Sequence, residues 1–151
     1  DVFWADSCKK RGFYMKLTAD QRALISDIKN RRRYPVVRLE LRSSRESELI
    51  STALNFVHIE DIHDTMETVK ARGNLIREMS QMRLIRVCFH LPVSARSDFQ
   101  IYYDSDVFAQ LRELVKEGEN KPEFLFDTAA IKRGVITVTE KGRRAFLSAK
   151  E

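Results

Sequence analysis

The densest group of side chains that could do chemistry lies in His58-Ile-Glu-Asp-Ile-His63-Asp, where two imidazoles stand among three carboxylates. Such a group could ligate a metal ion, but the two histidines are five residues apart, whereas one face of a helix requires a spacing of three or four. The zinc-protease pattern H-E-x-x-H is absent as well. We therefore interpret the segment as a solvated acidic face with ordinary, partly buried histidines, and predict no metal site there.

Other candidates for catalysis are weaker. His90 stands near Cys88, but the sequence offers no third group that would orient a Cys/His nucleophilic pair. The glycine-rich phosphate-binding motifs are absent, and the chain has only five glycines. Neighbouring carboxylates such as Asp104 and Asp106 are explained as helix caps and first-turn acids. We predict no catalytic residue, no cofactor and no enzymatic activity.

The charge is positive overall and unevenly spread along the chain. The 151 residues, enough for one ordinary domain, carry a net charge of +5 with a pI near 9.4. Residues 1–45 contain 12 Lys and Arg against 5 Asp and Glu, residues 46–120 contain 8 against 13, and residues 121–151 contain 7 against 4. The basic ends favour a polyanionic partner, whereas the acidic middle argues against simple DNA binding.

Cysteine use and hydropathy bear on the compartment. Cys8 and Cys88 lie far apart in unrelated contexts, so we predict no disulfide framework and a reducing environment. No apolar run approaches the roughly 18 residues of a membrane span, and the first residues lack the apolar core of a signal peptide. We expect a cytoplasmic protein without a membrane partner. The sequence begins at Asp1 rather than Met, so we also consider it a piece of a longer protein.

Capping signals and hydrophobic periodicity predict the elements of the first half. Thr18-Ala-Asp-Gln21 is a capping box that opens a short helix, and the alternation from Val37 to Leu41 predicts a strand. Beyond Ser44, apolar residues at helical spacing predict three helices, over about 47–57, 59–68 and 70–82, followed by a strand over 84–89.

The second half starts with a loop over 91–97. Alternating Phe99, Ile101 and Tyr103 then predict a strand, and a helix capped at Asp104 or Ser105 runs to Gly118. A strand ending at Val138 and a helix capped by Thr139 close the fold.

Two of these stretches carry a family resemblance. One is IREMSQMRLIRV (76–87), a helix running into a strand, and the other is VTEKGRRAF (138–146), a strand running into a helix. Together they resemble the winged helix-turn-helix superfamily, whose recognition helix commonly ends in a Leu-Arg-x-Leu-x-x-x-Gly-Leu-Ile-like run and whose wing strand closes in a Leu-Thr-x-x-Gly-Arg-like run. Arg83 stands where that superfamily usually has Gly.

The resemblance implies an α+β fold: a winged helix-turn-helix with an N-terminal helix/strand extension and a long insertion within the wing. We expect an arm, helix and strand over 1–44, the winged helix over 45–147 with its insertion over 91–130, and a tail over 148–151. The residues expected to be largely buried in its core are Ile76, Met79, Leu84, Ile85, Val87, Ile136, Val138 and Phe146.

In the related fold, the N-terminal part of the recognition helix enters the major groove, where Arg and Asn read base edges, and the wing tip touches phosphates or a minor groove. The resemblance places the tip in Ile131-Lys-Arg-Gly134. The residues expected to bind DNA, with the strongest local cation cluster added, are Lys70, Arg72, Asn74, Arg77, Lys132, Arg133, Arg31, Arg32 and Arg33. The alternative is a solvated helix face, a basic turn and a solubilising helix C-terminus.

Two hypotheses for function remain open. The first is a non-catalytic, DNA-binding winged helix that acts in transcription regulation or in a mobile element, plasmid or phage. The second is a winged-helix module that binds protein within a larger assembly, with the insertion 99–127 presenting Phe108, Phe124 or Phe126 to its partner. The sequence leaves open whether the chain forms a dimer.

Overall fold

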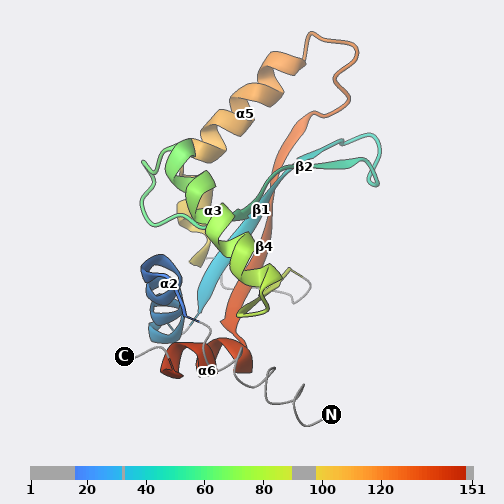
Figure 1. Ribbon diagram of the computed structural model, residues 1–151. Coiled ribbons are helices and arrows are strands. Elements are labelled where there is room, and N and C mark those ends of the chain that lie inside the picture. Colours follow the sequence, from blue (N-terminus) through green and yellow to red (C-terminus); the bar gives the residue numbers. More distant parts are fainter. Residues whose placement is uncertain (1–15, 32, 90–97, 149–151) are drawn as a thin grey trace. The chain divides into compact units, whose positions relative to one another are not determined.

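The computed structural model describes residues 16–31, 33–89 and 98–148, which form five helices and a four-stranded sheet (Figure 1). In chain order the elements are α2 (Ala19–Asn30), β1 (Tyr34–Arg42), β2 (Ile50–Val57), α3 (Met66–Gln81), β3 (Ile85–Cys88), α4 (Gln100–Tyr103), α5 (Asp106–Gly118), β4 (Thr128–Val138) and α6 (Glu140–Ser148). The strand order is β2-β1-β4-β3, and β1 and β2 are antiparallel. The expected α+β class is confirmed.

The chain divides into two compact units, each built from segments far apart in the sequence. The terminal unit contains residues 1–34, 75–87 and 136–151, and the central unit contains residues 35–74 and 88–135. Helix α3 and strands β3 and β4 each contribute to both units. The domain boundaries expected from the sequence stay a prediction.

In the terminal unit, α2 begins at the expected capping box. The Thr18 hydroxyl accepts a hydrogen bond from the backbone N–H of Gln21, and the Gln21 side chain accepts one from the backbone N–H of Thr18. The helix packs against α6, because Arg22 donates to the backbone oxygen of Phe146 at 2.9 Å and Lys29 lies over the ring of Phe146 (Figure 1).

The core of the terminal unit lies where the sequence predicts it. Ile76, Met79 and Leu84 have no exposed surface, and Ile85 and Ile136 are 2% exposed. Val87, Val138 and Phe146 are half-buried. Each large apolar side chain removed from water contributes roughly 1.5–3 kcal/mol. The stretch where α3 runs into β3 is therefore the centre of this unit.

The core of the central unit combines one face of the sheet with helices. Val37, Leu39 and Leu41 of β1 alternate into it, as the sequence predicts. Helix α5 is capped as expected, because the Ser105 hydroxyl accepts from the backbone N–H of Phe108. The other buried members of this core are Val57, Ile59, Val69, Phe99, Tyr102, Val107, Phe108, Leu111 and Val115.

The helix expected over about 47–57 is wrong, because residues 50–57 of this segment form strand β2. Its apolar spacing fits a helix, but pairing with β1 places Leu54 opposite Leu39 and Ile50 opposite Arg42. Leu54 then packs against the core and Val57 is buried within it. Tertiary pairing here outweighs a local pattern that periodicity alone leaves ambiguous.

The helix expected over 59–68 is also wrong. The Asp64 carboxylate accepts hydrogen bonds from the backbone N–H groups of Glu60 and Asp61, which holds this stretch as a turn. The Thr65 hydroxyl accepts from the N–H of Thr68, and α3 begins at Met66. The two helices expected directly before α3 are therefore a strand and a turn.

Two expectations in the second half need correction. The strand expected at Phe99 to Tyr103 is helix α4, because Phe99 and Tyr102, three residues apart, are both buried. The wing tip expected at Ile131 to Gly134 lies inside β4 instead. A Cβ atom on Gly134 would meet the Cys88 carbonyl oxygen at 2.6 Å, so this glycine serves a close approach of β3 rather than a turn.

Candidate functional site

Positive charge is concentrated in the terminal unit. Its described residues include 11 Lys and Arg against 4 Asp and Glu, a balance of +7, whereas those of the central unit include 10 against 15, a balance of −5. The middle of the sequence is acidic, but its cations Arg77, Arg83 and Arg86 fold with the basic ends. The acidic middle of the sequence argues against DNA binding by the chain as a whole, but it does not make the terminal unit acidic.

The exposed cations of the terminal unit lie on α2, α3, β3 and α6 and on the segments that flank them. They are Lys16, Lys29, Arg33, Arg77, Arg83, Arg86, Lys141, Arg143 and Arg144. On α6, Arg143 and Arg144 both pair with Glu140. The hydrogen bond and charge of Arg143, with the charge of Arg144, hold the pKa of Glu140 below its usual range. One carboxylate thus balances only one of two guanidinium groups.

Helix α3 ends in a tight turn at Arg83. The N–H of Arg83 donates to the carbonyl of Ser80, and the N–H of Leu84 donates to the carbonyl of Met79, both at 3.0 Å. These two bonds define a Schellman motif. Met79 and Leu84, which occupy the positions of its hydrophobic pair, are both buried. It requires a left-handed residue at Arg83, whose φ is 62°.

The start of α6 is tied to this turn. The Thr139 hydroxyl donates to the carbonyl of Arg83 at 2.6 Å, and the Lys141 ammonium donates to the carbonyl of Met82 at 2.9 Å. The same Thr139 hydroxyl accepts from the N–H of Gly142. The side chains of Arg83 and Lys141 therefore belong to one small region, formed by two motifs 50 residues and more apart in the sequence.

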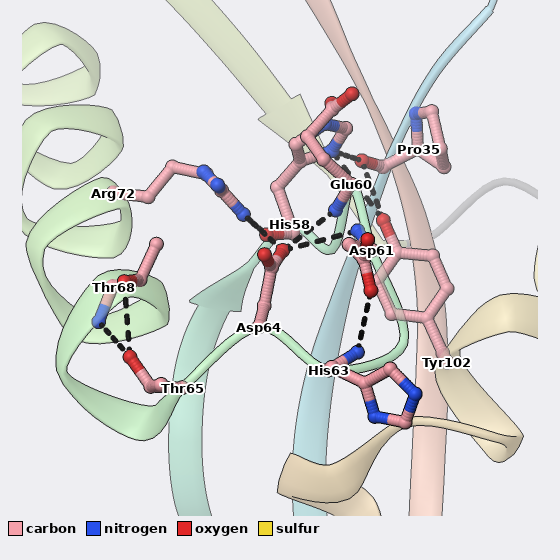
Figure 2. A network of polar contacts seen from close by, with 10 residues as sticks. All are labelled: Pro35, His58, Glu60, Asp61, His63, Asp64, Thr65, Thr68, Arg72 and Tyr102. Carbon is pink, nitrogen blue, oxygen red and sulfur yellow. Dashed lines mark hydrogen bonds and ion pairs between the residues drawn. The ribbon is translucent and has the colours of Figure 1, made fainter.

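The residues expected to bind DNA from α3 have different surroundings. Lys70 and Asn74 are exposed in the central unit, and Arg77 is exposed in the terminal unit. Arg72 is half-buried and donates to the His58 carbonyl at 2.6 Å and to Asp64 at 2.9 Å (Figure 2). Arg72 therefore holds the turn before α3.

The turn also contains a buried polar network (Figure 2). His58 is 1% exposed; its Nδ1 lies 2.7 Å from the Pro35 carbonyl oxygen, and its Nε2 faces the Glu60 carboxylate. A backbone carbonyl oxygen only accepts hydrogen bonds, so Nδ1 donates to Pro35. Tyr102 donates to the same Pro35 oxygen at 3.1 Å. The network joins β1, the turn and α4.

Hydrogen bonds shift the pKa of two groups in this turn, Asp64 and His63. Burial alone would raise the pKa of Asp64, but hydrogen bonds from Arg72 and from two backbone N–H groups outweigh burial, and the pKa lies below its usual value. Asp106 hydrogen-bonds the exposed His63 and raises the pKa of that imidazole. Glu60 and Asp61 are exposed, as expected of a solvated acidic face, whereas Asp64 is half-buried and holds the turn. The two histidines expected to be partly buried differ, since His58 is buried and His63 is exposed.

The remaining expected residues are spread over both units. Arg31 pairs with Asp27 at 3.1 Å and lies over the ring of Tyr34, while Arg33 is exposed. Arg32 lies outside the described residues. In β4, Lys132 is half-exposed, and Arg133 lies over Phe99 and donates to the Tyr103 hydroxyl.

Sequence reasoning did not select Arg83, Arg86, Lys141, Arg143 or Arg144 as site residues. One signal was present: Arg83 stands where the resembling pattern has Gly, which marks a left-handed position. The positions of the α6 cations depend on contacts between distant segments, and no local pattern encodes them.

Metal-binding clusters and membrane-spanning helices are both absent from residues 16–31, 33–89 and 98–148. No group of three or more His, Cys, Asp or Glu side chains within this part of the chain is placed to hold a metal ion. No helix among the same residues is long and apolar enough to cross a membrane.

Comparison of the chain with models of known families, with curated proteins and with solved structures gives no match.

Proposed function

We propose that the chain binds double-stranded DNA through its terminal unit, without catalysis. The observation that carries the proposal is the separation of charge, +7 in the described residues of this unit against −5 in those of the other. A protein that neutralises DNA phosphates releases condensed counterions, which supplies most of the affinity for any duplex. The terminal unit has the cations for this, and the central unit does not have them in excess.

The second support is the arrangement of the terminal unit, which we propose to be winged-helix-like. It combines α2, the C-terminal half of α3, most of β3, the end of β4 and α6. The segments that carry the winged helix-turn-helix resemblance, residues 76–87 and 138–146, lie in this unit. DNA contact by Arg77 stays part of the proposal, since Arg77 is exposed on the part of α3 that belongs to this unit. Contacts by Lys70 and Asn74, which lie in the central unit, stay predictions outside it. Contacts by Arg72, Lys132 and Arg133 are not part of the proposal.

The experiment compares two matched charge reversals. Arg143→Glu with Arg144→Glu changes α6 of the terminal unit, and Arg112→Glu with Lys116→Glu changes α5 of the central unit, by the same amount of charge. All four side chains are exposed. Fluorescence anisotropy with a labelled duplex should show a large loss of affinity for the α6 variant and little change for the α5 variant. Equal losses in both variants would contradict binding through the terminal unit.

A second candidate function is protein binding by the insertion, and one observation favours it. A cleft of about 460 Å³ in the central unit has Leu49, Phe124, Leu125 and Phe126 in its lining, and Leu125 is 62% exposed. The rest of the lining is largely polar and includes Arg45, Glu46, Glu119, Lys121 and Asp127. Phe108, expected to meet a partner, is instead 5% exposed in the core. An apolar dye such as ANS should fluoresce with the wild type and less with Leu125→Asp. Equal fluorescence of the two would remove the cleft as a site.

A further inference from the structure

Arg83 occupies a backbone conformation that its side chain disfavours. At φ 62° the Cβ atom of an L-residue crowds the following carbonyl, and glycine is the residue that helices favour at this position of the turn. Residues held in such conformations cluster at functional sites, where the surroundings hold them in place. An arginine at this position therefore costs the fold stability relative to glycine, and its side chain is the part that glycine lacks.

The side chain of Arg83 has no visible structural use. Among residues 16–31, 33–89 and 98–148 its guanidinium has no hydrogen-bond or ion-pair partner, and the side chain is exposed. The turn is built by backbone atoms and by buried Met79 and Leu84, which glycine at 83 would leave unchanged. A cation near a helix C-terminus does favour the helix dipole, but Lys141 already donates to the Met82 carbonyl directly after α3.

A second cation is held at the same turn. The Lys141 ammonium bonds to the Met82 carbonyl, and the Thr139 hydroxyl bonds to the carbonyl of Arg83 itself. These two contacts place a second cationic residue at the backbone turn that carries Arg83. The two side chains suit the same kind of ligand, because phosphate oxygens accept hydrogen bonds from a guanidinium fork and from an ammonium.

We infer that Arg83 is a phosphate-contacting residue: with Lys141 it binds the DNA backbone at the turn between α3 and β3. The inference rests on the proposed function and assigns it a specific contact outside the part of α3 that the sequence suggested. A phosphate contact contributes affinity without reading sequence. The loss of Arg83 should therefore weaken binding to unrelated duplexes equally.

The test uses three replacements of one residue in the full chain. Arg83→Gly and Arg83→Asn remove the charge and tolerate the left-handed backbone, whereas Arg83→Lys keeps the charge and the strain. Counterion release gives a factor of salt concentration to the power −0.9 for each phosphate contact, which is about eightfold in affinity at 0.1 M salt. Glycine and asparagine variants should lose about this factor, and the salt slope should become shallower by about 0.9.

Thermal melting of the same proteins separates binding from folding. Arg83→Gly should melt at a higher temperature than the wild type while it binds DNA more weakly, a combination that a purely structural role would not produce. Arg83→Lys should keep the wild-type salt slope. Lys116→Ala is the matched control, because it removes an exposed cation from the last turn of α5 in the central unit and should leave affinity unchanged.

Each outcome has a separate meaning. If the wild type does not bind duplex DNA at low salt, the proposed function itself fails. If the wild type binds and Arg83→Gly binds with the same affinity and slope, the Arg83 contact is refuted and the proposed function stands. If Arg83→Gly loses both affinity and melting temperature, Arg83 serves the fold, and the inference is again refuted.

Discussion

Gly142→Ala tests how closely α6 approaches the end of α3. A Cβ atom at this position would lie 2.1 Å from the Leu84 carbonyl oxygen, 3.0 Å from the Leu84 carbonyl carbon and 2.9 Å from a methyl carbon of Val138. The nearest atom belongs to the backbone and cannot rotate away. The substitution therefore forces α6 to move away from the turn between α3 and β3.

The expected magnitude follows from two opposing effects. Overpacking of a well-packed site costs about 1–3 kcal/mol, and the contact with a backbone oxygen places this site at the upper end. Alanine gains about 1 kcal/mol over glycine as a helix residue. The net loss in free energy of unfolding is about 2 kcal/mol, which lowers the urea midpoint by about 1 M for a small protein.

Urea denaturation followed by far-ultraviolet circular dichroism measures this loss. Leu147→Ala is the control on the same helix, because Leu147 is 55% exposed and its replacement should change stability by less than about 0.5 kcal/mol. A Gly142→Ala protein as stable as the wild type would refute the close packing of α6 on Leu84. It would also remove the structural basis for the shared site of Arg83 and Lys141.

Two further predictions concern the two units separately. Met79→Asp places an unpaired charge where the side chain has no exposed surface, and it should lower the free energy of unfolding by more than about 4 kcal/mol. Met79→Leu should lower it by less than about 1.5 kcal/mol. A Met79→Asp protein that melts like the wild type would contradict the burial of Met79 in the core. Asp64 has a folded-state pKa below its ordinary 3.8, so the stability that it contributes is complete above the unfolded-state pKa and is lost as the pH falls through the folded-state pKa. Asp64→Asn should therefore be less stable than the wild type at neutral pH and lose less stability on acidification, and parallel pH profiles in urea denaturation would contradict this role.

The sequence predicted elements whose signals are local. In four places neighbouring residues are enough to determine the local conformation. These are the capping box at Thr18, the alternation over β1, the cap at Ser105 and the helix-to-strand stretch around Met79. The sequence misplaced β2 and the turn before α3, where long-range pairing with β1 and hydrogen bonds to Asp64 decide the conformation. Apolar spacing contains no information about such partners.

The candidate site was predicted only in part for a related reason. The charge count along the chain separated basic ends from an acidic middle, but folding assigns Arg77, Arg83 and Arg86 to the basic terminal unit. The resemblance pointed to α3 as a whole, although Arg72 is engaged by His58 and Asp64. The sequence shows that Arg83 stands where the resembling pattern has glycine. Only the structure shows that the position has a left-handed backbone, with a φ of 62°, which is the reason that glycine is favoured there.

The most direct test of DNA binding by the terminal unit is a salt titration of the wild type against a mixed-sequence duplex. The account predicts that the logarithm of the association constant falls linearly with the logarithm of salt concentration, by about 0.9 for each phosphate contacted, and that reversal of Arg143 and Arg144 makes the slope shallower. An affinity that does not change with salt, or a slope that the α6 reversal leaves unchanged, would contradict the account.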